Sequence, residues 1–285
     1  MDGATTLVGI IGQPVVHSRS PQMHNAAFRA LGLNWAYVPF PVEPAELGDA
    51  VAGLKALGVR GFNVTIPHKQ AVMPLLDDIS PAAVAIGAVN TVVIDGGRLV
   101  GHNTDGEGFL RSLTEAHRFR LERSRALILG AGGASRAVCD ALARAGVPAL
   151  RISNRSAGKA EELAATIRAH HPGCDAKALD WNPLDHRAAI NWAELIVNTT
   201  SVGLHVGDGS PLDTNGISPG HIVADLIYNP PQTPLLQKCA ALRARTLNGL
   251  GMLLHQGAAA FALWTGKDAP VDVMRRALDG EPRPS

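Results

Sequence analysis

The chain has 285 residues, of which 46% are hydrophobic and 18% charged, and its formal net charge is +1. This length and apolar content suit one large or two ordinary domains, and the balanced charge gives no indication of a nucleic-acid or membrane partner. Cysteine usage argues against a disulfide framework or a cysteine metal site, because Cys139, Cys174 and Cys239 are odd in number and far apart. We therefore expect a reducing, cytoplasmic setting, without a targeting or membrane-spanning segment.

Strand and helix patterns alternate through the first part of the chain. We predict strands at residues 6–12, 35–42 and 59–66, and helices at residues 20–32 and 44–58. The prolines within residues 35–42 indicate that this strand lies at a sheet edge or ends there. Residues 88–103 have the pattern of a hairpin that turns at Asp95, Gly96 and Gly97. These elements predict a mostly parallel sheet with one antiparallel piece.

A second array of strands and helices begins near Arg125. Its predicted strands lie at residues 126–130, 149–154, 176–181, 194–200 and 221–228, and its main helices at residues 131–146, 160–171 and 233–245. Five or six parallel strands with helices on both faces form a Rossmann-like, doubly wound domain. The tail from Gly249 contains two helical patterns without a strand, so we expect it to return to the first domain, with a frayed Pro-rich end. The predicted fold class is α/β, with residues 1–104 and 249–285 in the first domain and residues 105–248 in the second.

A glycine-rich turn links the first strand and the first helix of this second array. Gly130, Gly132 and Gly133 allow a tight turn, and they let backbone N–H groups approach a pyrophosphate at the helix N-terminus. Ser135 stands where the dinucleotide-binding fingerprint has its third glycine. The alternative is an ordinary loop between strand and helix, but the strand–turn–helix context favours a dinucleotide site.

The end of the next strand indicates which dinucleotide binds. NAD sites usually carry an acidic residue there for the ribose 2′-hydroxyl, whereas this chain has Asn154, followed by Arg155 and, one helical turn later, Lys159. A guanidinium pairs well with a 2′-phosphate, and the missing acid removes a repulsion against it. The alternative is a solvated basic helix start. We expect NADP(H), because cations at a helix N-terminus are unfavourable unless an anion binds.

Two serines precede the first helix of the chain. Ser18 and Ser20 supply two hydroxyls beside a helix N-terminus, an arrangement that suits a carboxylate ligand. The alternative for Ser20 is a helix N-cap, because Pro21 follows it at the first helical position. Ser18 has no such structural explanation in the sequence.

Lys69 lies in the first turn of a helix that we predict to begin at Pro67. A helix N-terminus disfavours a cation, which points to a functional lysine; the alternative is a solvated lysine whose stem packs on the helix. Hydroxyl, amide and carboxylate side chains at strand ends, helix starts and in the tail accompany it: Asn63, Thr65, Asn90, Asn103, Thr104, Asp105 and Gln256. Asn63 and Thr65 are two apart on a strand and so should face the same side, whereas Asp105 has the alternative of a helix N-cap. Around one lysine, these groups suit a small polyhydroxylated acid.

The order and spacing of these motifs resemble the shikimate dehydrogenase family over almost the whole chain. The segments that carry the resemblance are HSRSPQMHN (17–25), NVTIPHK (63–69), GAVNT (87–91), NTDGEG (103–108), LILGAGGASRA (127–137), NRS (154–156), DLIYNP with TPLL (225–236) and NGLGMLLHQGAAAF (248–261). The resemblance implies reversible, NADPH-dependent reduction of 3-dehydroshikimate to shikimate in aromatic amino-acid biosynthesis. It also implies a substrate-binding first domain, an NADP-binding second domain and C-terminal helices that pack on the first. Residues 198–204 depart from the family's usual pattern, which leaves the nicotinamide-side contacts there open.

The roles of individual residues are carried over from the family by motif position. Lys69 and Asp105 would form the catalytic acid–base pair. The substrate would contact Ser18, Ser20, Asn63, Thr65, Asn90, Tyr228 and Gln256. The cofactor would contact Gly130, Ala131, Gly132, Gly133, Ala134, Asn154, Arg155, Ser156 and Lys159, with Gly249 and Met252 near the nicotinamide. No metal is expected.

Two other functions stay open at this point. One is a quinate/shikimate dehydrogenase that uses NAD, against which the Asn154–Ser156 triplet argues. The other is a non-catalytic NADP-binding regulatory protein, which would not need Lys69 and Asp105 together. The expected partner is a small-molecule substrate rather than nucleic acid or a membrane, and the chain is expected to be a monomer or a homodimer.

Overall fold

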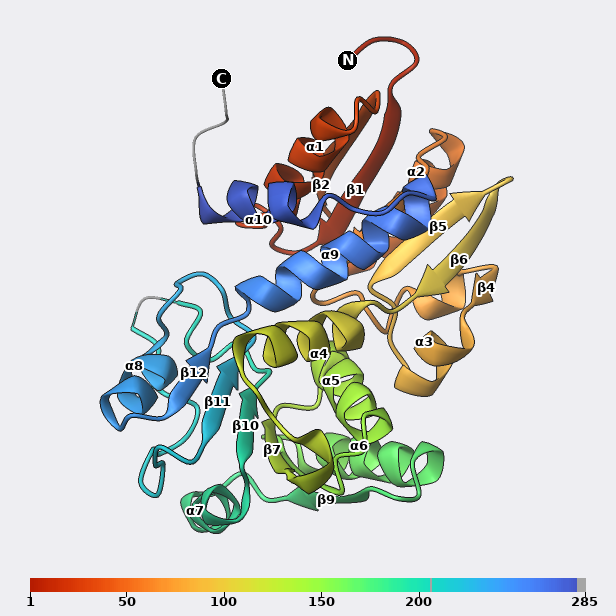
Figure 1. Ribbon diagram of the computed structural model, residues 1–285. Helices are drawn as coiled ribbons and strands as arrows, with labels where there is room; N and C mark the ends of the chain where they lie inside the picture. The colour runs from red at the N-terminus through yellow and green to blue at the C-terminus, as the bar shows by residue number, and fades with distance from the viewer. Residues whose placement is uncertain (206, 281–285) are drawn as a thin grey trace. The chain divides into compact units, whose positions relative to one another are not determined.

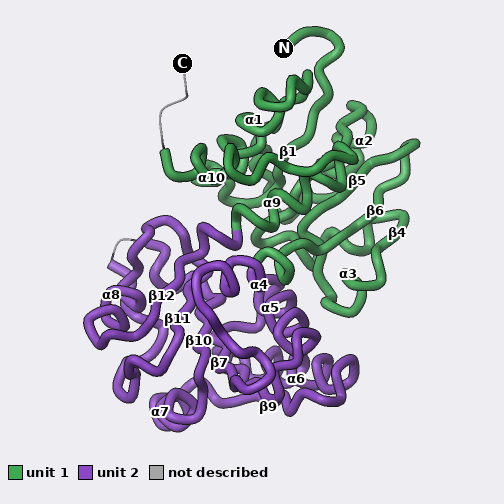
Figure 2. Tube along the Cα trace, viewed as in Figure 1, with its two compact units in different colours: residues 1–108, 253–285 green, residues 109–252 purple. Residues whose placement is uncertain are grey.

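The computed structural model describes residues 1–205 and 207–280. It divides into two compact units (Figure 2): unit 1 comprises Met1–Gly108 and Leu253–Ser285, and unit 2 comprises Phe109–Met252. Asp105 therefore belongs to unit 1, although the sequence led us to expect it in the second domain. The Pro-rich end, which we expected to fray, lies outside the described residues from 281 onward.

Among the described residues, unit 1 contains a six-stranded sheet with the strand order β2-β1-β3-β5-β6-β4 (Figure 1). Its strands are β1 (Thr6–Gly12), β2 (Trp35–Pro41), β3 (Gly61–Val64), β4 (Asp78–Ile79), β5 (Thr91–Asp95) and β6 (Arg98–His102). β1 runs parallel to β2 and β3, whereas β5 is antiparallel to β3 and β6. The edge position of β2 and the β5–β6 hairpin are both confirmed. Gly96 and Gly97 form the turn at positive φ (54° and 77°), as a tight hairpin requires.

Two of the helices predicted in the N-terminal part of unit 1 are present, and a third helix there was not predicted. This part contains α1 (Ser20–Ala30), α2 (Leu47–Ala56) after a short 3-10 helix (Pro44–Glu46), and α3 (Pro81–Ile86). The sequence-based prediction missed α3, although its signals are present. The Ser80 hydroxyl accepts a hydrogen bond from Ala83 N–H, Pro81 lies in the first turn, and Gly87 ends the helix in the left-handed conformation. A helix of this length has too few residues for a clear apolar period.

The helix predicted after Pro67 is wrong. Residues 66–72 form consecutive turns, and only Met73–Leu75 continues them as a 3-10 helix. Hydrogen bonds to other parts of unit 1 explain the difference. The Lys69 carbonyl accepts from Val89 N–H at 2.8 Å, and the His68 ring bonds the Val42 carbonyl at 2.7 Å. These bonds fix the segment at two points, so tertiary contacts override a local helical preference.

The C-terminal helices belong to unit 1, as predicted. They are α9 (Leu250–Thr265), which crosses from unit 2, and α10 (Val271–Asp279), which packs on α1. The buried Trp264 of α9 donates its indole N–H to the Val92 carbonyl of β5 at 3.0 Å. Phe261, on the same helix, stacks on Phe28 of α1 at a centroid distance of 5.3 Å. The tail is thus part of the hydrophobic core of unit 1.

Among the described residues, unit 2 contains a six-stranded, fully parallel sheet with the order β12-β11-β10-β7-β8-β9. Its strands are β7 (Arg125–Leu129), β8 (Ala149–Ser153), β9 (Asp175–Leu179), β10 (Leu195–Asn198), β11 (Ile222–Asp225) and β12 (Arg245–Leu247). Its helices are α4 (Asp105–Ala116), which starts in unit 1, α5 (Gly133–Arg144), α6 (Ala157–His170), α7 (Pro183–Trp192) and α8 (Pro234–Ala241). The order reverses between β7 and β10, which is where doubly wound sheets bind ligands.

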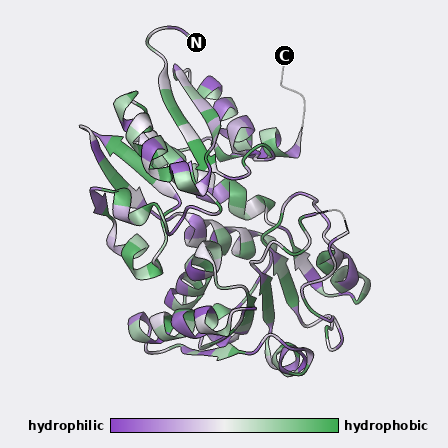
Figure 3. Ribbon diagram, turned by 180° about the vertical axis from the view of Figure 1, so that it is seen from behind, coloured by the Kyte–Doolittle hydropathy of each residue, from purple (hydrophilic) through white to green (hydrophobic). Residues whose placement is uncertain are grey.

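Two apolar clusters cover the two faces of this sheet. One contains residues of α5 and α6, and the other residues of α7 and α8. The strands are coloured mainly as hydrophobic in Figure 3, which fits a sheet covered on both sides. The predicted doubly wound architecture is confirmed.

The cysteine thiols are part of the interior of unit 2, and burial raises the pKa of Cys174 and of Cys239 to about 11.

Candidate active site

The polar residues predicted in unit 1 meet at one edge of its sheet because of the strand register. Asn63, near the end of β3, pairs with Thr91 at the start of the antiparallel β5. Thr91 in turn pairs with His102 at the end of β6. Four segments therefore converge at this edge of the sheet. They are the residues after β1, the turn after β3, the residues before β5 and the start of α4. Parallel strands end at the edge where α/β sheets bind their ligands.

The centre of this edge is an ion pair between Lys69 and Asp105. Lys69 Nζ lies 2.5 Å from Asp105 Oδ2, and the side chains are 15% and 4% exposed. The pair joins the turn after β3 to the first residue of α4. A carboxylate so deeply buried is stable only when it is paired and hydrogen-bonded. The pair is thus a short, charge-assisted contact with the lysine on its more accessible side.

Asn90 connects this pair to the rest of the edge. Its amide donates to Asp105 Oδ1 and to Thr104 Oγ1, both at 2.9 Å, and lies 3.4 Å from Gln256 Oε1. Its own Oδ1 accepts from Thr104 N–H at 2.8 Å. The predicted residues Asn90, Asp105 and Gln256 are therefore brought together around Lys69.

The N-cap alternative for Asp105 is wrong. Asp105 is the first residue of α4, and its carboxylate bonds Lys69 and Asn90. Asn103 accepts the Asp105 N–H through its Oδ1 at 3.0 Å, and its amide donates to the Ala88 carbonyl at 2.9 Å. Asn103 thus satisfies the helix start, which leaves the Asp105 carboxylate for other contacts.

The N-cap alternative for Ser20 is also wrong. Arg19 occupies the N-cap position, no side chain of the described residues caps the helix there, and Ser20 is a buried residue of α1. Ser18 Oγ instead accepts a hydrogen bond from Ser20 N–H at 3.3 Å. As an acceptor in that bond, Ser18 still has its O–H to donate. The Arg19 guanidinium donates to the Leu278 carbonyl at the end of α10.

Asn63 and Thr65 are arranged differently from each other. β3 ends at Val64, so Thr65 already belongs to the following turn, where its methyl group lies close to Gly12. Asn63 is 4% exposed, and its amide donates to the Asn90 carbonyl at 3.1 Å and to Thr91 Oγ1 at 3.0 Å. Both amide hydrogens of Asn63 are therefore used within the protein. Its carbonyl oxygen accepts from the Tyr37 hydroxyl at 2.8 Å and has one lone pair left for a ligand hydroxyl.

The glycine-rich turn of unit 2 has the geometry that an anion at the α5 N-terminus needs. Gly130 has φ +112°, which favours glycine, and Gly132 is the N-cap. A Cβ built at Gly132 meets no atom of the described residues within 4 Å, so the space beside it is open. Gly132 is exposed, and Gly133 and Ala134 are half-buried. Open N–H groups beside free space can hold a pyrophosphate.

Ser135, which replaces the third fingerprint glycine, is fully buried and bonded to Thr199. The two hydroxyl oxygens lie 2.5 Å apart, and Thr199 donates to the Leu129 carbonyl at 2.7 Å. The residue that departs from the dinucleotide-binding fingerprint thus contacts Thr199, which lies in the segment that departs from the family pattern. A Cβ at Gly130 would lie 2.5 Å from Thr199 Oγ1, so this glycine cannot be replaced without displacing the pair.

The predicted 2′-phosphate residues lie at the start of α6. Asn154 donates its amide to the Ser156 carbonyl at 3.0 Å, which shapes the turn. Arg155, Ser156 and Lys159 are exposed, and neither cation forms an ion pair with another described residue. Exposed cations at a helix N-terminus are unfavourable on their own, and they suit an anionic ligand.

The remaining predicted residues belong to unit 2. Gly249 lies against Leu226, and a Cβ there would be 2.0 Å from the Leu226 carbonyl oxygen, so only glycine fits. Met252 is 8% exposed and belongs to the core of unit 2. Tyr228 is half-buried on the loop after β11.

Asp225 shapes that loop, and the sequence-based prediction gave it no role. Its carboxylate accepts from Thr233 Oγ1 at 2.7 Å, from Asn198 Nδ2 at 3.0 Å and from Ile227 N–H at 3.1 Å. Burial raises the pKa of Asp225 despite these bonds. The signal was its position at the end of a buried strand, before the segment that carries Tyr228.

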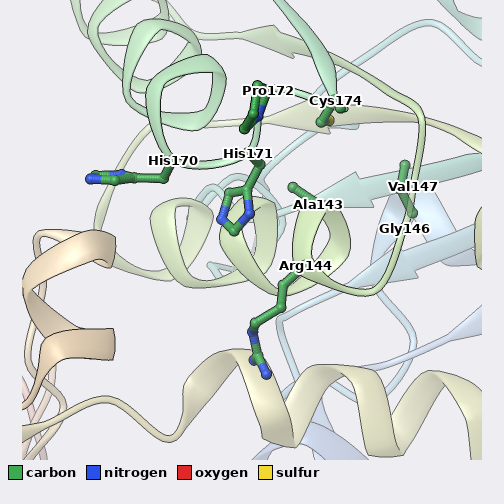
Figure 4. Close-up of a pocket in the computed structure, with 9 residues that line it drawn as sticks. Ala143, Arg144, Gly146, Val147, His170, His171, Pro172 and Cys174 are labelled. Atoms are coloured by element: carbon green, nitrogen blue, oxygen red, sulfur yellow. The ribbon is translucent and has the colours of Figure 1, made fainter.

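A cavity of about 350 Å³ in unit 2 lies elsewhere (Figure 4). It is lined by residues at the C-terminal ends of α5 and α6 and in the segments after them, including Arg144, His170, His171 and Cys174, and by none of the predicted site residues. His171 bonds Asp140 at 2.8 Å, so its ring already has a partner.

Within the described chain no cluster of His, Cys, Asp and Glu has the arrangement of a metal site. In that same part of the chain, every helix is too short or too polar to cross a bilayer.

Three family models match the chain. The shikimate dehydrogenase substrate binding domain matches residues 10–92. The shikimate / quinate 5-dehydrogenase model matches residues 112–204. The shikimate 5′-dehydrogenase C-terminal domain matches residues 249–278. Together these models account for more than half of the chain.

Relatives of the whole chain agree with these models. The shikimate dehydrogenase (NADP(+)) of Desulforamulus reducens is 48% identical over 281 residues, which are 98% of this chain and 96% of that protein. A crystal structure of a shikimate dehydrogenase in complex with NADP+ matches with a TM-score of 0.90 and 41% identity, over 98% of this chain and 96% of the other. A quinate dehydrogenase from Corynebacterium glutamicum, in complex with NAD, matches with a TM-score of 0.87 and 36% identity, over 97% and 99% of the chains. The chain therefore belongs to the shikimate/quinate dehydrogenase family.

Proposed function

We propose that the protein is an NADP-dependent shikimate dehydrogenase, which reduces 3-dehydroshikimate to shikimate reversibly. The observation that carries this proposal is the buried Lys69–Asp105 pair, surrounded by amide and hydroxyl groups at the ligand-binding edge of unit 1. We assign substrate binding to unit 1 and cofactor binding to unit 2, where the glycine-rich turn and the cations at the α6 start fit a dinucleotide with a 2′-phosphate. The named activity and cofactor of the relatives support both assignments.

In this proposal Lys69 is the acid–base group. The hydride for the C3 carbonyl is supplied by NADPH when it is bound. The Lys69 ammonium donates a proton to the alkoxide that develops at C3, and the neutral amine takes that proton back in the oxidation direction. Asp105 orients the amine and accepts a hydrogen bond from a substrate hydroxyl. Asn90 holds the Asp105 carboxylate and lies 3.4 Å from Gln256, and we assign both amides to the neighbouring substrate hydroxyls.

The substrate carboxylate is assigned to Ser18 and Ser20 of unit 1. Ser20→Ala is the cleaner test, because the Ser20 side chain does not cap α1 whereas the Ser18 hydroxyl bonds the helix backbone. We expect Ser20→Ala to raise the KM for shikimate about tenfold, the value of one charge-assisted hydrogen bond, and to leave the KM for NADP+ unchanged. Steady-state kinetics measures both constants. Ser80→Ala, which removes a real N-cap, should lower stability without changing either KM. An unaltered KM for shikimate in Ser20→Ala would remove Ser20 from the site.

The cofactor assignment predicts that Arg155 is a 2′-phosphate contact. Arg155→Ala should lose about 1–3 kcal/mol of NADP+ affinity, the scale of a hydrogen bond to a charged group, and change NAD+ use little. Fluorescence titration with each dinucleotide measures this. Lys177→Ala is the matched control, since Lys177 is also an exposed cation of unit 2 but pairs with Asp175 on β9. Equal losses for both dinucleotides in Arg155→Ala would contradict a phosphate contact.

The activity itself is tested by absorbance at the nicotinamide band, with shikimate or quinate and with NADP+ or NAD+. We expect the highest kcat/KM for shikimate with NADP+. The similarity to a quinate dehydrogenase that binds NAD makes quinate with NAD+ the second candidate, and the highest value with that combination would replace our proposal. Absence of turnover in all four combinations would contradict dehydrogenase function.

A further inference from the structure

A chain of hydrogen bonds runs behind the Lys69–Asp105 pair and ends at a residue outside the proposed site. Tyr37 Oη lies 2.8 Å from Asn63 Oδ1, and Asn63 Nδ2 lies 3.0 Å from Thr91 Oγ1. Thr91 Oγ1 lies 3.0 Å from Asn90 Oδ1, and Asn90 Nδ2 lies 2.9 Å from Asp105 Oδ1. Each of these residues is at most 4% exposed. The chain thus connects β2 at the sheet edge, through β3 and β5, to the start of α4.

Two backbone groups determine the direction of hydrogen-bond donation along this chain, because a carbonyl can only accept and an N–H can only donate. The Asn90 carbonyl can only accept, so the Asn63 atom 3.1 Å from it is the amide nitrogen, and Asn63 Oδ1 faces Tyr37. Tyr37 must therefore donate. Thr104 N–H can only donate, so Asn90 Oδ1 faces it and the Asn90 amide nitrogen faces Asp105. Thr91 then accepts from Asn63 and donates to Asn90.

Tyr37 is held rigidly by its surroundings. Its ring stacks on His24 with a centroid distance of 4.5 Å and an interplanar angle of 4°, and lies 6.0 Å from Trp264. His24 is fully buried, and burial lowers the pKa of its imidazole to about 3, so the ring stays neutral at ordinary pH. The phenol O–H is the first donor of the chain, and it bonds the Oδ1 atom of Asn63, a residue that is 4% exposed.

We propose that Tyr37 is a positioning residue for the Lys69–Asp105 pair. Its O–H holds the Asn63 amide in one orientation, and Asn63 and Thr91 hold the Asn90 amide that aims the Asp105 carboxylate. This proposal rests on the proposed dehydrogenase function, because it assigns Tyr37 an effect on that reaction. Without the phenol O–H, Asn63 Oδ1 is a buried acceptor without this donor, so the amide turns away from its present partners and the chain loses its order.

The test is a double-mutant cycle in the full-length protein, with shikimate and NADP+ as the assayed pair. Tyr37→Phe keeps the ring and removes the O–H, and Thr91→Val interrupts the same chain further along. We expect each single variant to lower kcat/KM for shikimate about tenfold, with the KM for NADP+ unchanged. Because both substitutions break one chain, the double variant should also lose about tenfold, whereas independent effects would multiply to about a hundredfold. A hundredfold loss in the double variant would overturn the proposal.

Two further variants separate positioning from stability. His24→Phe preserves the stack on Tyr37 without touching the chain, and should keep kcat/KM within about twofold of the unsubstituted protein. Thr91→Ser retains the hydroxyl and should recover most of the activity that Thr91→Val loses, which makes the test independent of how well Tyr37→Phe folds. Equal activities of Thr91→Ser and Thr91→Val, or a Tyr37→Phe protein with unaltered kinetics, would overturn the proposal while the dehydrogenase function stands. An unsubstituted protein without dehydrogenase activity would overturn both.

Discussion

Replacement of Lys69 by methionine is expected to lower kcat about 10²–10⁴-fold, the usual contribution of a positioned acid–base group. Methionine keeps an unbranched apolar stem of similar length and removes only the ammonium. The Asp105 carboxylate, 4% exposed, then loses the partner that lies 2.5 Å from it and retains Asn90 as a donor. Both the proton donor and the orientation of Asp105 are therefore impaired, so the loss should appear in kcat more than in the KM for shikimate.

Lys55→Met is the matched control for this experiment. Lys55 also pairs with an aspartate of unit 1, but that pair is exposed and 3.4 Å long, so its loss should change kcat little. NADP+ binding, measured by fluorescence, should persist in Lys69→Met, because the glycine-rich turn belongs to unit 2. A Lys69→Met protein that retains most of its kcat would return Lys69 to a structural role.

Deletion of residues 253–285 is expected to abolish the cooperative folding of unit 1. The deleted segment includes Phe261 and Trp264, which are almost completely buried, and Met274 and Leu278 of α10. Truncation of one large buried aromatic side chain to alanine typically costs about 3–5 kcal/mol. With about 2–5 kcal/mol for each aliphatic side chain, removal of all four costs about 10–20 kcal/mol, which equals or exceeds the total stability of about 5–15 kcal/mol that a domain has. Circular dichroism and thermal unfolding of the truncated protein measure this outcome.

Two point variants of α9 test the same claim on a smaller scale. Trp264→Ala removes a 2% exposed ring and the hydrogen bond to Val92, and should lower the free energy of unfolding by about 3–5 kcal/mol. Leu263→Ala changes the neighbouring residue, which is 38% exposed, and should cost much less. A truncated protein that unfolds cooperatively and still binds shikimate would show that the tail is dispensable.

An element could be predicted from the sequence when its own residues determine its structure, and not when hydrogen bonds to distant residues do. Five of the six strands of unit 2 and its main helices follow local apolar patterns, and their prediction is confirmed, whereas β12 was not predicted and the helix predicted at residues 233–245 ends at Ala241. Residues 66–72 look like a helix start after Pro67, yet the His68 ring bonds the Val42 carbonyl and the Lys69 carbonyl accepts from Val89 N–H, and both partners are distant in sequence. α3 is missed because it is short, although Ser80 and Gly87 mark both of its ends. Local patterns predict long elements well, whereas short or tertiary-bonded segments need the structure.

The same distinction applies to the site. Lys69, Asn90, Asp105 and Gln256 are predicted from motifs, and the structure brings them together. Orientation is not predictable in this way: Ser18 rather than Ser20 bonds the start of α1, and both amide hydrogens of Asn63 turn inward. These details depend on strand register and on which atom of each amide faces an obligate donor or acceptor.

Tyr37 illustrates what sequence reasoning misses. On a strand with neighbouring apolar residues, an aromatic side chain is typical of a hydrophobic core. Its ring does lie in the core, 2% exposed, but its O–H bonds Asn63 and starts the chain to Asp105. A polar contact of this kind is visible only when the residues of β2 and β3 are placed next to each other.

The most direct test of the central claim is the transfer of deuterium from NADPH labelled with deuterium at both C4 positions. The unsubstituted protein is incubated with this cofactor and 3-dehydroshikimate, and the product is analysed by mass spectrometry. Our account predicts shikimate that carries a single deuterium at C3, at a rate that falls about 10²–10⁴-fold in Lys69→Met. Product without the label, or no product at all, would contradict hydride transfer to this substrate as the function of the protein.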